Sequence, residues 1–284
     1  MMRNNKFTFL LIALMGISLF SCTKPVEKEI GLQLWSVRDA MKADAAATIA
    51  RVGEIGYSFV ETAGYSDGKF YGMEPLEFKA LLNENGLEFL ASHTGQALPD
   101  SSNWDEKMAW WDTAIDAHAA AGVKYIVQPF MDGKGYGSIE DLKLFCDYFN
   151  VVGEKCNAKG IRFGYHNHDK EFQEVDGIRR YDFMLQNTDP DKVFFQLDLY
   201  WISVGGQVAQ EYFEQYPGRF LLWHVKDEKE LGGAESIMDF EPIFAAAEVS
   251  GKKHIVVEVE RYSFDPLESV KVSYDFLMAS DFVK

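Results

Sequence analysis

Eight short runs of apolar, β-branched and aromatic residues recur along the chain from residue 30 onward. Their starts lie about 27 to 38 residues apart, and the intervals carry apolar residues at helical spacing. Such a rhythm predicts eight alternating strands and helices, which is the pattern of a single (β/α)8 barrel. The runs are Ile30–Trp35, Ser58–Thr62, Leu87–His93, Val123–Phe130, Ile161–His166, Val193–Leu199, Phe220–Val225 and His254–Glu260.

Glycines support the same α/β reading, because several stand just before a predicted strand. A glycine there can end the preceding helix in the left-handed conformation and turn the chain back. An open doubly wound sheet is the alternative, but the first run is followed by no glycine-rich phosphate loop. We therefore predict one barrel over residues 30–284. The five glycines are Gly56, Gly86, Gly122, Gly160 and Gly251.

The N-terminal residues are predicted to be a secretory signal of the lipoprotein type. Within residues 1–21, Arg3 and Lys6 precede an apolar run that contains no acidic residue. The stretch Leu19-Phe20-Ser21-Cys22 resembles a bacterial lipobox, which implies cleavage before Cys22 and lipid attachment to its sulfur. Residues 22–29 are then a tether, and the barrel faces the periplasm or the cell surface. An uncleaved N-terminal anchor is the alternative.

Composition limits the partners. With 44 acidic and 28 basic residues the formal net charge is −16, so binding to nucleic acid or to anionic lipid is not expected.

The three cysteines do not form a disulfide framework. Cys146 and Cys156 fall in one predicted helix, about 15 Å apart at 1.5 Å per residue, so we predict two buried free thiols.

Polar residues gather where the predicted strands end, which is where a parallel barrel builds its active site. Alternation within each strand turns them inward, while the apolar residues of opposite parity face the helices. A buried carboxylate needs a partner, and a divalent cation suits Asp198, His224 and Glu258 on three consecutive strands. The polar residues at the strand ends are Gln33, Glu61, His93, Gln128, His166, His168, Asp198, His224, Lys226, Glu258 and Glu260, and the parity argument applies to those of strands six to eight.

Five motifs together resemble the xylose isomerase-like barrel superfamily, in particular its sugar phosphate isomerase/epimerase branch. They are Gly31–Arg38, Gly164–Asp169, Leu197-Asp198, His224–Asp227 and Val257-Glu258. The resemblance implies a divalent ion (Mn, Zn, Co or Mg) held by residues that end strands five to eight. Carried over by position, the ligands are His166, Asp198, His224 and Glu258. Strand five departs from the epimerase pattern, which has a glutamate there, and leaves His168 as a substitute ligand or a substrate contact.

The activity implied by this resemblance is the isomerisation or epimerisation of a sugar or keto-sugar through an enediolate. Glu258, His166 and His168 are the predicted proton-transfer groups. The predicted substrate contacts are Gln33, Trp35, Glu61, His93, Lys226 and Trp201. Few cations lie near the predicted site, so an uncharged carbohydrate is favoured over a sugar phosphate.

Other functions stay open at this point. The same chemistry supports a lyase, a dehydratase or an enzyme that cleaves keto-glycosides. A membrane-tethered sugar-binding protein without catalysis is a further alternative, which His166 favours because it replaces a catalytic glutamate. A metal-dependent endonuclease would need a basic surface, and the acidic charge argues against it. Whether the chain forms a homo-oligomer is not determined by the sequence.

Overall fold

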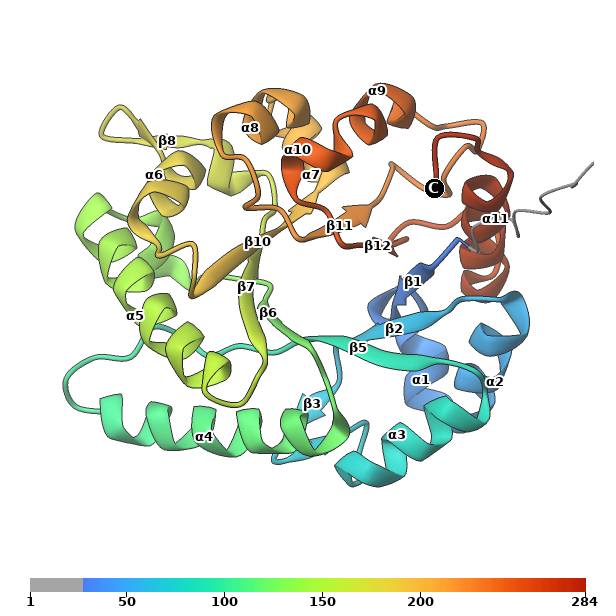
Figure 1. The fold of residues 1–284 in the computed structure, drawn as a ribbon, viewed down its shortest axis with the longest axis horizontal. Helices are drawn as coiled ribbons and strands as arrows, with labels where there is room; N and C mark the ends of the chain where they lie inside the picture. Colours follow the sequence, from blue (N-terminus) through green and yellow to red (C-terminus); the bar gives the residue numbers. More distant parts are fainter. Residues whose placement is uncertain (1–27) are drawn as a thin grey trace, which may run out of the picture.

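The computed structural model describes residues 28–284, and eight parallel strands in this range close into a barrel (Figure 1). Their order around the barrel is β1-β12-β11-β10-β7-β6-β5-β2. Each predicted run contains one of these strands, so the predicted (β/α)8 fold is confirmed. The strands are β1 (Ile30–Gln33), β2 (Phe59–Thr62), β5 (Glu88–His93), β6 (Tyr125–Gln128), β7 (Arg162–His166), β10 (Val193–Asp198), β11 (Leu222–Val225) and β12 (His254–Val257).

Helices surround the barrel, as Figure 1 shows. They are α1 (Arg38–Ala43), α2 (Ala45–Ile55), α3 (Pro75–Glu84), α4 (Trp104–Ala121), α5 (Ile139–Asn157), α6 (Arg180–Asn187), α7 (Leu199–Val204), α8 (Ala209–Gln215), α9 (Phe240–Ala245), α10 (Ala247–Ser250) and α11 (Pro266–Ala279). Short elements decorate the loops: the 3-10 turns η1 (Leu34–Val37), η2 (Gly133–Tyr136) and η3 (Lys170–Phe172), and the hairpins β3 (Tyr65–Ser66) with β4 (Lys69–Phe70) and β8 (Glu174–Val175) with β9 (Ile178–Arg179).

Several strands end earlier than the apolar runs predicted. Trp35 was placed in the first strand, but β1 stops at Gln33 and Trp35 lies in η1. The Gln33 side chain accepts a hydrogen bond from the Trp35 backbone N–H at 3.0 Å, which starts the turn. The apolar run therefore continues past the end of the strand into the loop that follows it.

The two faces of the strands separate as alternation predicts. Leu222 packs inside the barrel with the buried side chains of Val127 and Phe194. Trp223, its neighbour of opposite parity, stacks on Phe213 of α8 with ring centroids 5.0 Å apart and is fully buried outside the barrel. Long polar side chains can consequently meet at one end of the barrel interior, above this apolar layer.

Two smaller predictions are also confirmed. All five predicted capping glycines have positive φ; Gly122, for example, ends α4 with φ 82°. Cys146 and Cys156 both lie on α5, where they are buried and free.

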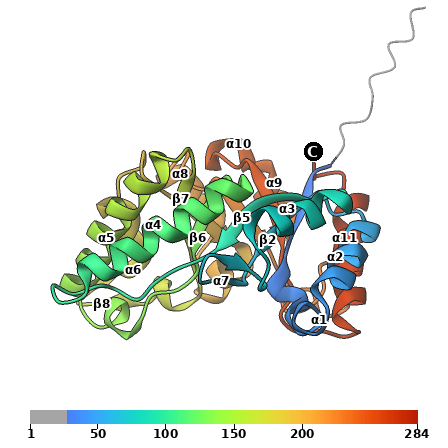
Figure 2. The same cartoon turned by 90° about the horizontal axis from the view of Figure 1, so that it is seen from below.

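The start of the described chain lies at the end of the barrel opposite the carboxyl ends of the strands. In Figure 2 the C-terminus is at the upper edge, whereas α1 and α7, which follow β1 and β10, are at the lower edge. Lys28 Nζ donates to the backbone oxygens of Met278 at 2.8 Å and Ser280 at 2.7 Å, near the end of α11. The predicted signal segment 1–21 and residues 22–27 of the tether lie outside the described residues. Within the described range, no helix is both long and apolar enough to span a bilayer.

Candidate functional site

Four side chains from four consecutive barrel strands meet at the carboxyl ends of the strands. His166 ends β7, Asp198 ends β10, His224 is the third residue of β11, and Glu258 follows β12. One donor atom from each lies within 4.8 Å of every other, and all four residues are buried. The structure thus brings together the four predicted metal ligands.

The polar atoms of this cluster match a bound cation. His166 Nδ1 and Asp198 Oδ2 are buried and have no hydrogen-bond partner within the described residues. A buried polar atom without a partner costs free energy, on the order of 1–3 kcal/mol. Asp198 Oδ1, in contrast, accepts from the Trp201 backbone N–H at 2.7 Å and caps α7, which fixes the direction of its free oxygen. Two imidazoles and two carboxylates, of which His166 and Asp198 each keep one unpartnered atom, are a set that holds divalent transition metals.

A fifth buried side chain, Glu61 of β2, lies against the far side of His224. Its Oε2 is 2.6 Å from His224 Nε2, while His224 Nδ1 faces Glu258 Oε2 at 3.2 Å and Asp198 Oδ2 at 4.0 Å. Glu61 also accepts hydrogen bonds from Gln33 Nε2 and Gln196 Nε2, each at 2.8 Å. A carboxylate on one imidazole nitrogen fixes the ring and leaves the other nitrogen for a metal.

The charges within the cluster are mutually stabilised. Burial alone would lower the pKa of His224, but the carboxylates of Glu258 and Glu61 outweigh burial and raise that pKa to about 10. For Glu61, burial acts to raise the pKa, yet His93 and His224 bring it well below its usual range. Burial and the adjacent imidazoles hold the pKa of His166 far below its ordinary value, so its ring is neutral at pH 7, the form that binds metals.

Lys226 lies directly beside the cluster and pairs with two carboxylates. Its Nζ is 3.2 Å from Glu258 Oε2 and also contacts Glu260, and only 2% of Lys226 is exposed. Burial opposes the charged form of Glu258, but Lys226 and His224 outweigh it and hold the pKa of Glu258 well below its usual range. Glu258 is therefore ionised at neutral pH and held in one orientation.

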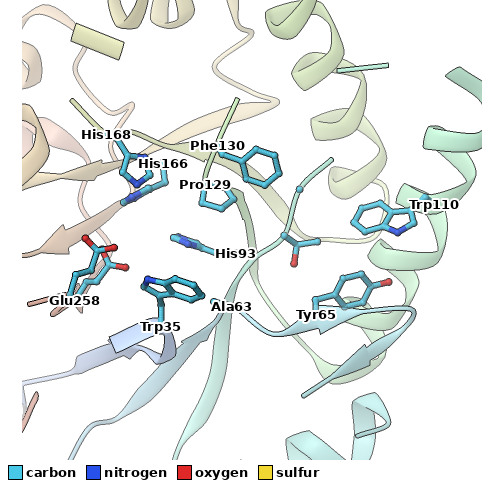
Figure 3. A pocket seen from close by; sticks show the side chains of 13 residues that line it. Trp35, Ala63, Tyr65, His93, Trp110, Pro129, Phe130, His166, His168 and Glu258 are labelled. Carbon is cyan, nitrogen blue, oxygen red and sulfur yellow. The ribbon is translucent and has the colours of Figure 1, made fainter. Parts of the chain in front are cut away.

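A cleft of about 520 Å³ opens above the cluster, and its walls are largely aromatic (Figure 3). In Figure 3, Trp35 and His93 lie across the cleft from His168, and Tyr65 and Trp110 close its far end. Among the lining residues in the described chain, none is Lys or Arg. They are Trp35, Ala63, Tyr65, His93, Thr94, Gly95, Trp110, Pro129, Phe130, His166, His168, Glu258 and Glu260.

The six predicted substrate contacts lie at three kinds of position: in the cleft, buried below it, and behind its wall. Trp35, which is 45% exposed, and His93 line the cleft. Gln33 and Glu61 are fully buried below it, and Lys226 is almost fully buried. Trp201 stands behind His168, with ring centroids 5.8 Å apart, and does not line the cleft. Gln33, Glu61 and Lys226 bond to other side chains at the site, so their geometry is that of supports for the cluster, and the substrate contact predicted for them stays a prediction.

The loop that carries His168 is held in place by Glu171, a residue that no sequence pattern selected. Glu171 is fully buried and accepts from Tyr165 Oη at 2.5 Å, Tyr136 Oη at 2.9 Å and the His168 backbone N–H at 3.0 Å. Trp110 was also not predicted, because it lies on α4 rather than at a strand end. Phe130 lies two residues after the end of β6, so the strand-end rule that selected His93 applies to it as well.

Comparison with known proteins assigns most of the barrel to one family. Residues 49–279 match the family described as xylose isomerase-like TIM barrel. A crystal structure titled sugar phosphate isomerase/epimerase from Parabacteroides distasonis is 33% identical, with a TM-score of 0.84 over 91% of this chain and 100% of that one. The 3-keto-D-glucoside 4-epimerase of E. coli shares the fold at 16% identity, with a TM-score of 0.69 over 89% of this chain and 100% of that one.

A second comparison, by sequence, finds a similarity to another class of sugar-modifying enzyme. The inosose dehydratase of Geobacillus kaustophilus is 23% identical over 250 residues, which cover 75% of this chain and 79% of that protein. Two classes of sugar-modifying enzyme, isomerases/epimerases and dehydratases, are thus represented among the similar proteins.

Proposed function

Because the chain belongs to the xylose isomerase-like TIM barrel family, we propose that it is a divalent-metal-dependent isomerase or epimerase of a sugar or keto-sugar. The observation that carries this proposal is the cluster of His166, Asp198, His224 and Glu258 with two unpartnered donor atoms at the floor of an aromatic cleft. A cleft of about 520 Å³ falls in the size range of small-molecule sites. The reaction moves a carbon-bound proton next to a carbonyl group.

These four residues would hold the ion. When bound, a divalent cation supplies Lewis acidity, which stabilises negative charge that develops on the oxygens of the substrate. The two imidazoles favour Zn, Co or Mn and make Mg a poorer fit. His166 takes the position where the epimerases carry a glutamate, so one carboxylate charge is missing from the ligand set of this chain.

Glu258 is the proposed base. It lines the cleft, and Lys226 keeps it ionised and oriented at 3.2 Å. His168, also in the cleft, carries a ring that burial keeps neutral by lowering its pKa, so the ring can accept or return a proton on the substrate. His166 is a proposed metal ligand, and its neutral imidazole is also close enough to the cleft to take part in proton transfer. This division replaces the pair of glutamates that the resemblance implies for the epimerases.

The cleft favours an uncharged carbohydrate. Trp35 offers an exposed indole face for a sugar ring, and His93 a partner for a hydroxyl group. Glu258 and Glu260 point acidic groups into the same space, and Lys226 is already paired with both. A phosphate group in this cleft would meet two carboxylates and no free cation, which disfavours a sugar phosphate.

Hydrogen exchange tests this function. The protein, loaded with Mn2+ or Zn2+, is incubated in deuterated water with a panel of ketoses and 3-keto-glycosides, and carbon-bound deuterium is measured by NMR. We expect metal-dependent exchange in wild-type protein and at least a hundredfold slower exchange in Glu258→Gln, on the scale of losing a general base. The matched control is Glu241→Gln, an exposed glutamate on α9 outside the cleft. Tight binding without exchange would instead identify a sugar-binding protein, the alternative that His166 favours.

Dehydration is the second candidate, and the similarity to inosose dehydratases supports it. It begins with the same proton removal but continues with loss of a β-hydroxyl group. Product analysis separates the two reactions, because an epimerase returns an isomer of unchanged mass and a dehydratase gives a product lighter by one water.

We also propose that the chain is an exported lipoprotein. The described chain starts at the barrel end opposite the cleft, so a lipid on Cys22 would leave the cleft open to solvent. Metabolic labelling with a palmitate analogue tests this. Wild-type protein should carry the label and partition into detergent, and Cys22→Ser should carry none.

A further inference from the structure

A second cleft of about 510 Å³ adjoins the first on the side of η1 and α1. Trp35 and Ala63 line both clefts. The other lining residues of this second cleft are Leu34, Arg38, Asp39, Met41, Lys42 and Tyr71. None of them belongs to the metal cluster, so the second cleft is a distinct space that begins where the first one ends.

The side chain of Trp35 forms the boundary between the two clefts. The Arg38 guanidinium, which lines only the second cleft, lies 5.0 Å from the centre of the indole ring. Arg38 in turn donates to the Trp35 backbone oxygen at 3.1 Å and to Tyr262 Oη at 2.7 Å. The indole is thus held in place from one side by a cation–π contact and remains 45% exposed.

Ala63 supplies the connection past this boundary. It follows β2 directly, and its backbone N–H donates to Tyr71 Oη at 3.1 Å, which fixes the loop. Ala63 is half-buried and has the smallest side chain that still lines both clefts. Ala63 and Trp35 are therefore the walls that the two clefts share.

The chemistry of the second cleft suits a polyhydroxylated ring. Trp35 and Tyr71 provide aromatic surface, and Leu34 and Met41 lie buried behind the wall of the cleft. Arg38 and Lys42 add hydrogen-bond donors, and Asp39 adds an acceptor. A hydroxyl group can pair with either kind, because it both donates and accepts. The volume is that of a small-molecule site rather than of a single anion.

We infer that the substrate has two rings: the reacting sugar sits above the metal cluster, and a second sugar ring occupies the cleft between Trp35, Tyr71 and Lys42. The inference rests on the proposed function, because it names the substrate class of that same site. The preferred substrates are then disaccharides or other glycosides in place of free monosaccharides.

Calorimetric binding to the Mn2+-loaded protein tests this without turnover. The one-ring probes are methyl α- and β-glucoside, and the two-ring probes are maltose and cellobiose; glucose 6-phosphate is a third class. We expect at least one disaccharide to bind about tenfold more tightly than its methyl glucoside, equivalent to about 1.4 kcal/mol. Equal affinities, or binding of neither class, would overturn the inference. Tighter binding of glucose 6-phosphate than of both disaccharides would also overturn it, because the cleft would then be an anion site.

Two variants locate the effect. Ala63→Leu narrows the passage, and Lys42→Ala removes an exposed polar group that lines only the second cleft. Each should lower the affinity for the disaccharide at least threefold. Lys42→Ala should leave the affinity for the methyl glucoside unchanged, and Ala63→Leu, which alters a residue of both clefts, should lower that affinity by a smaller factor than it lowers the affinity for the disaccharide. Ala46→Leu, at an exposed position on α2, is the control for Ala63→Leu. Should the variants affect both ligands equally, the second cleft holds no second ring. A disaccharide preference without any hydrogen exchange would leave this inference standing while removing the proposed catalysis.

Discussion

The support that Glu61 gives to His224 can be tested by one substitution, Glu61→Gln. The exchange keeps the shape of the side chain but replaces one carboxylate oxygen by an NH2 group. In the wild-type protein, Gln33 and Gln196 donate to the carboxylate at 2.8 Å, and ring nitrogens of His224 at 2.6 Å and of His93 at 3.2 Å also face it. Whichever way the new amide turns, its NH2 group meets at least one of these donors.

The expected loss of metal affinity follows from this mismatch of donors. A buried donor left without an acceptor costs about 1–3 kcal/mol, and the charge-assisted bond to His224 is replaced by a weaker neutral one. His224 then loses the partner that keeps its Nδ1 turned toward Asp198 and Glu258. Removal of such a partner weakens metal binding about 10- to 100-fold, which corresponds to roughly 1.4–2.7 kcal/mol.

Competition with a chromophoric chelator measures the affinity for Zn2+ directly, independent of any activity. Far-UV circular dichroism checks that the variant is folded. The matched control is Glu88→Gln, because Glu88 is half-exposed at the start of β5, the opposite end of the barrel, and pairs only with Lys124. An affinity of Glu61→Gln within twofold of wild-type protein would refute the supporting role.

Three further predictions concern the cluster and the stability of the barrel. His224→Ala should remove the central ligand, so metal analysis of purified protein should find the ion in wild-type protein and at least tenfold less of it in the variant. Burial lowers the pKa of His118 to about 4, so between pH 6.5 and 4 the unfolded chain binds the extra proton. The free energy of unfolding should consequently fall by up to about 3 kcal/mol as pH falls through that window, and His118→Gln should remove this part of the decrease in urea titrations. Trp223→Ala should destabilise the fold by about 3–5 kcal/mol in urea denaturation, because the fully buried indole stacks on Phe213; the exposed Trp104→Ala should cost far less.

The barrel itself was predictable because its physics is local and repeated. Each strand is a short apolar run, and each helix carries its own amphipathic period, so eight weak signals in a fixed rhythm reinforce one another. The ends of the strands were less predictable. Trp35 is apolar enough to extend a strand, and only the hydrogen bond from its N–H to the Gln33 side chain shows that the chain has already turned.

The metal cluster was predictable for a related reason. Parity places Asp198, His224 and Glu258 inward, and parallel strands bring their carboxyl ends to one side. The substrate contacts stay predictions, since parity says which way a side chain points but not how deeply it is buried. Gln33 and Glu61 are register partners on β1 and β2 and point inward at the same level. Whether they meet a ligand or each other depends on what reaches across from β10 and β11.

The stagger of the barrel decides that question. In the register of the strands, Asp198 pairs with His224, but His224 pairs with Val256 and not with Glu258, and His166 pairs with Gln196 and not with Asp198. The four predicted ligands thus come from different levels of the sheet. They converge only because their side chains differ in length and in direction. Gln196 and His224 can then reach Glu61 and bond to its carboxylate beneath the cleft. A site built across several levels of a closed barrel is therefore set by long-range register, which no single stretch of sequence contains.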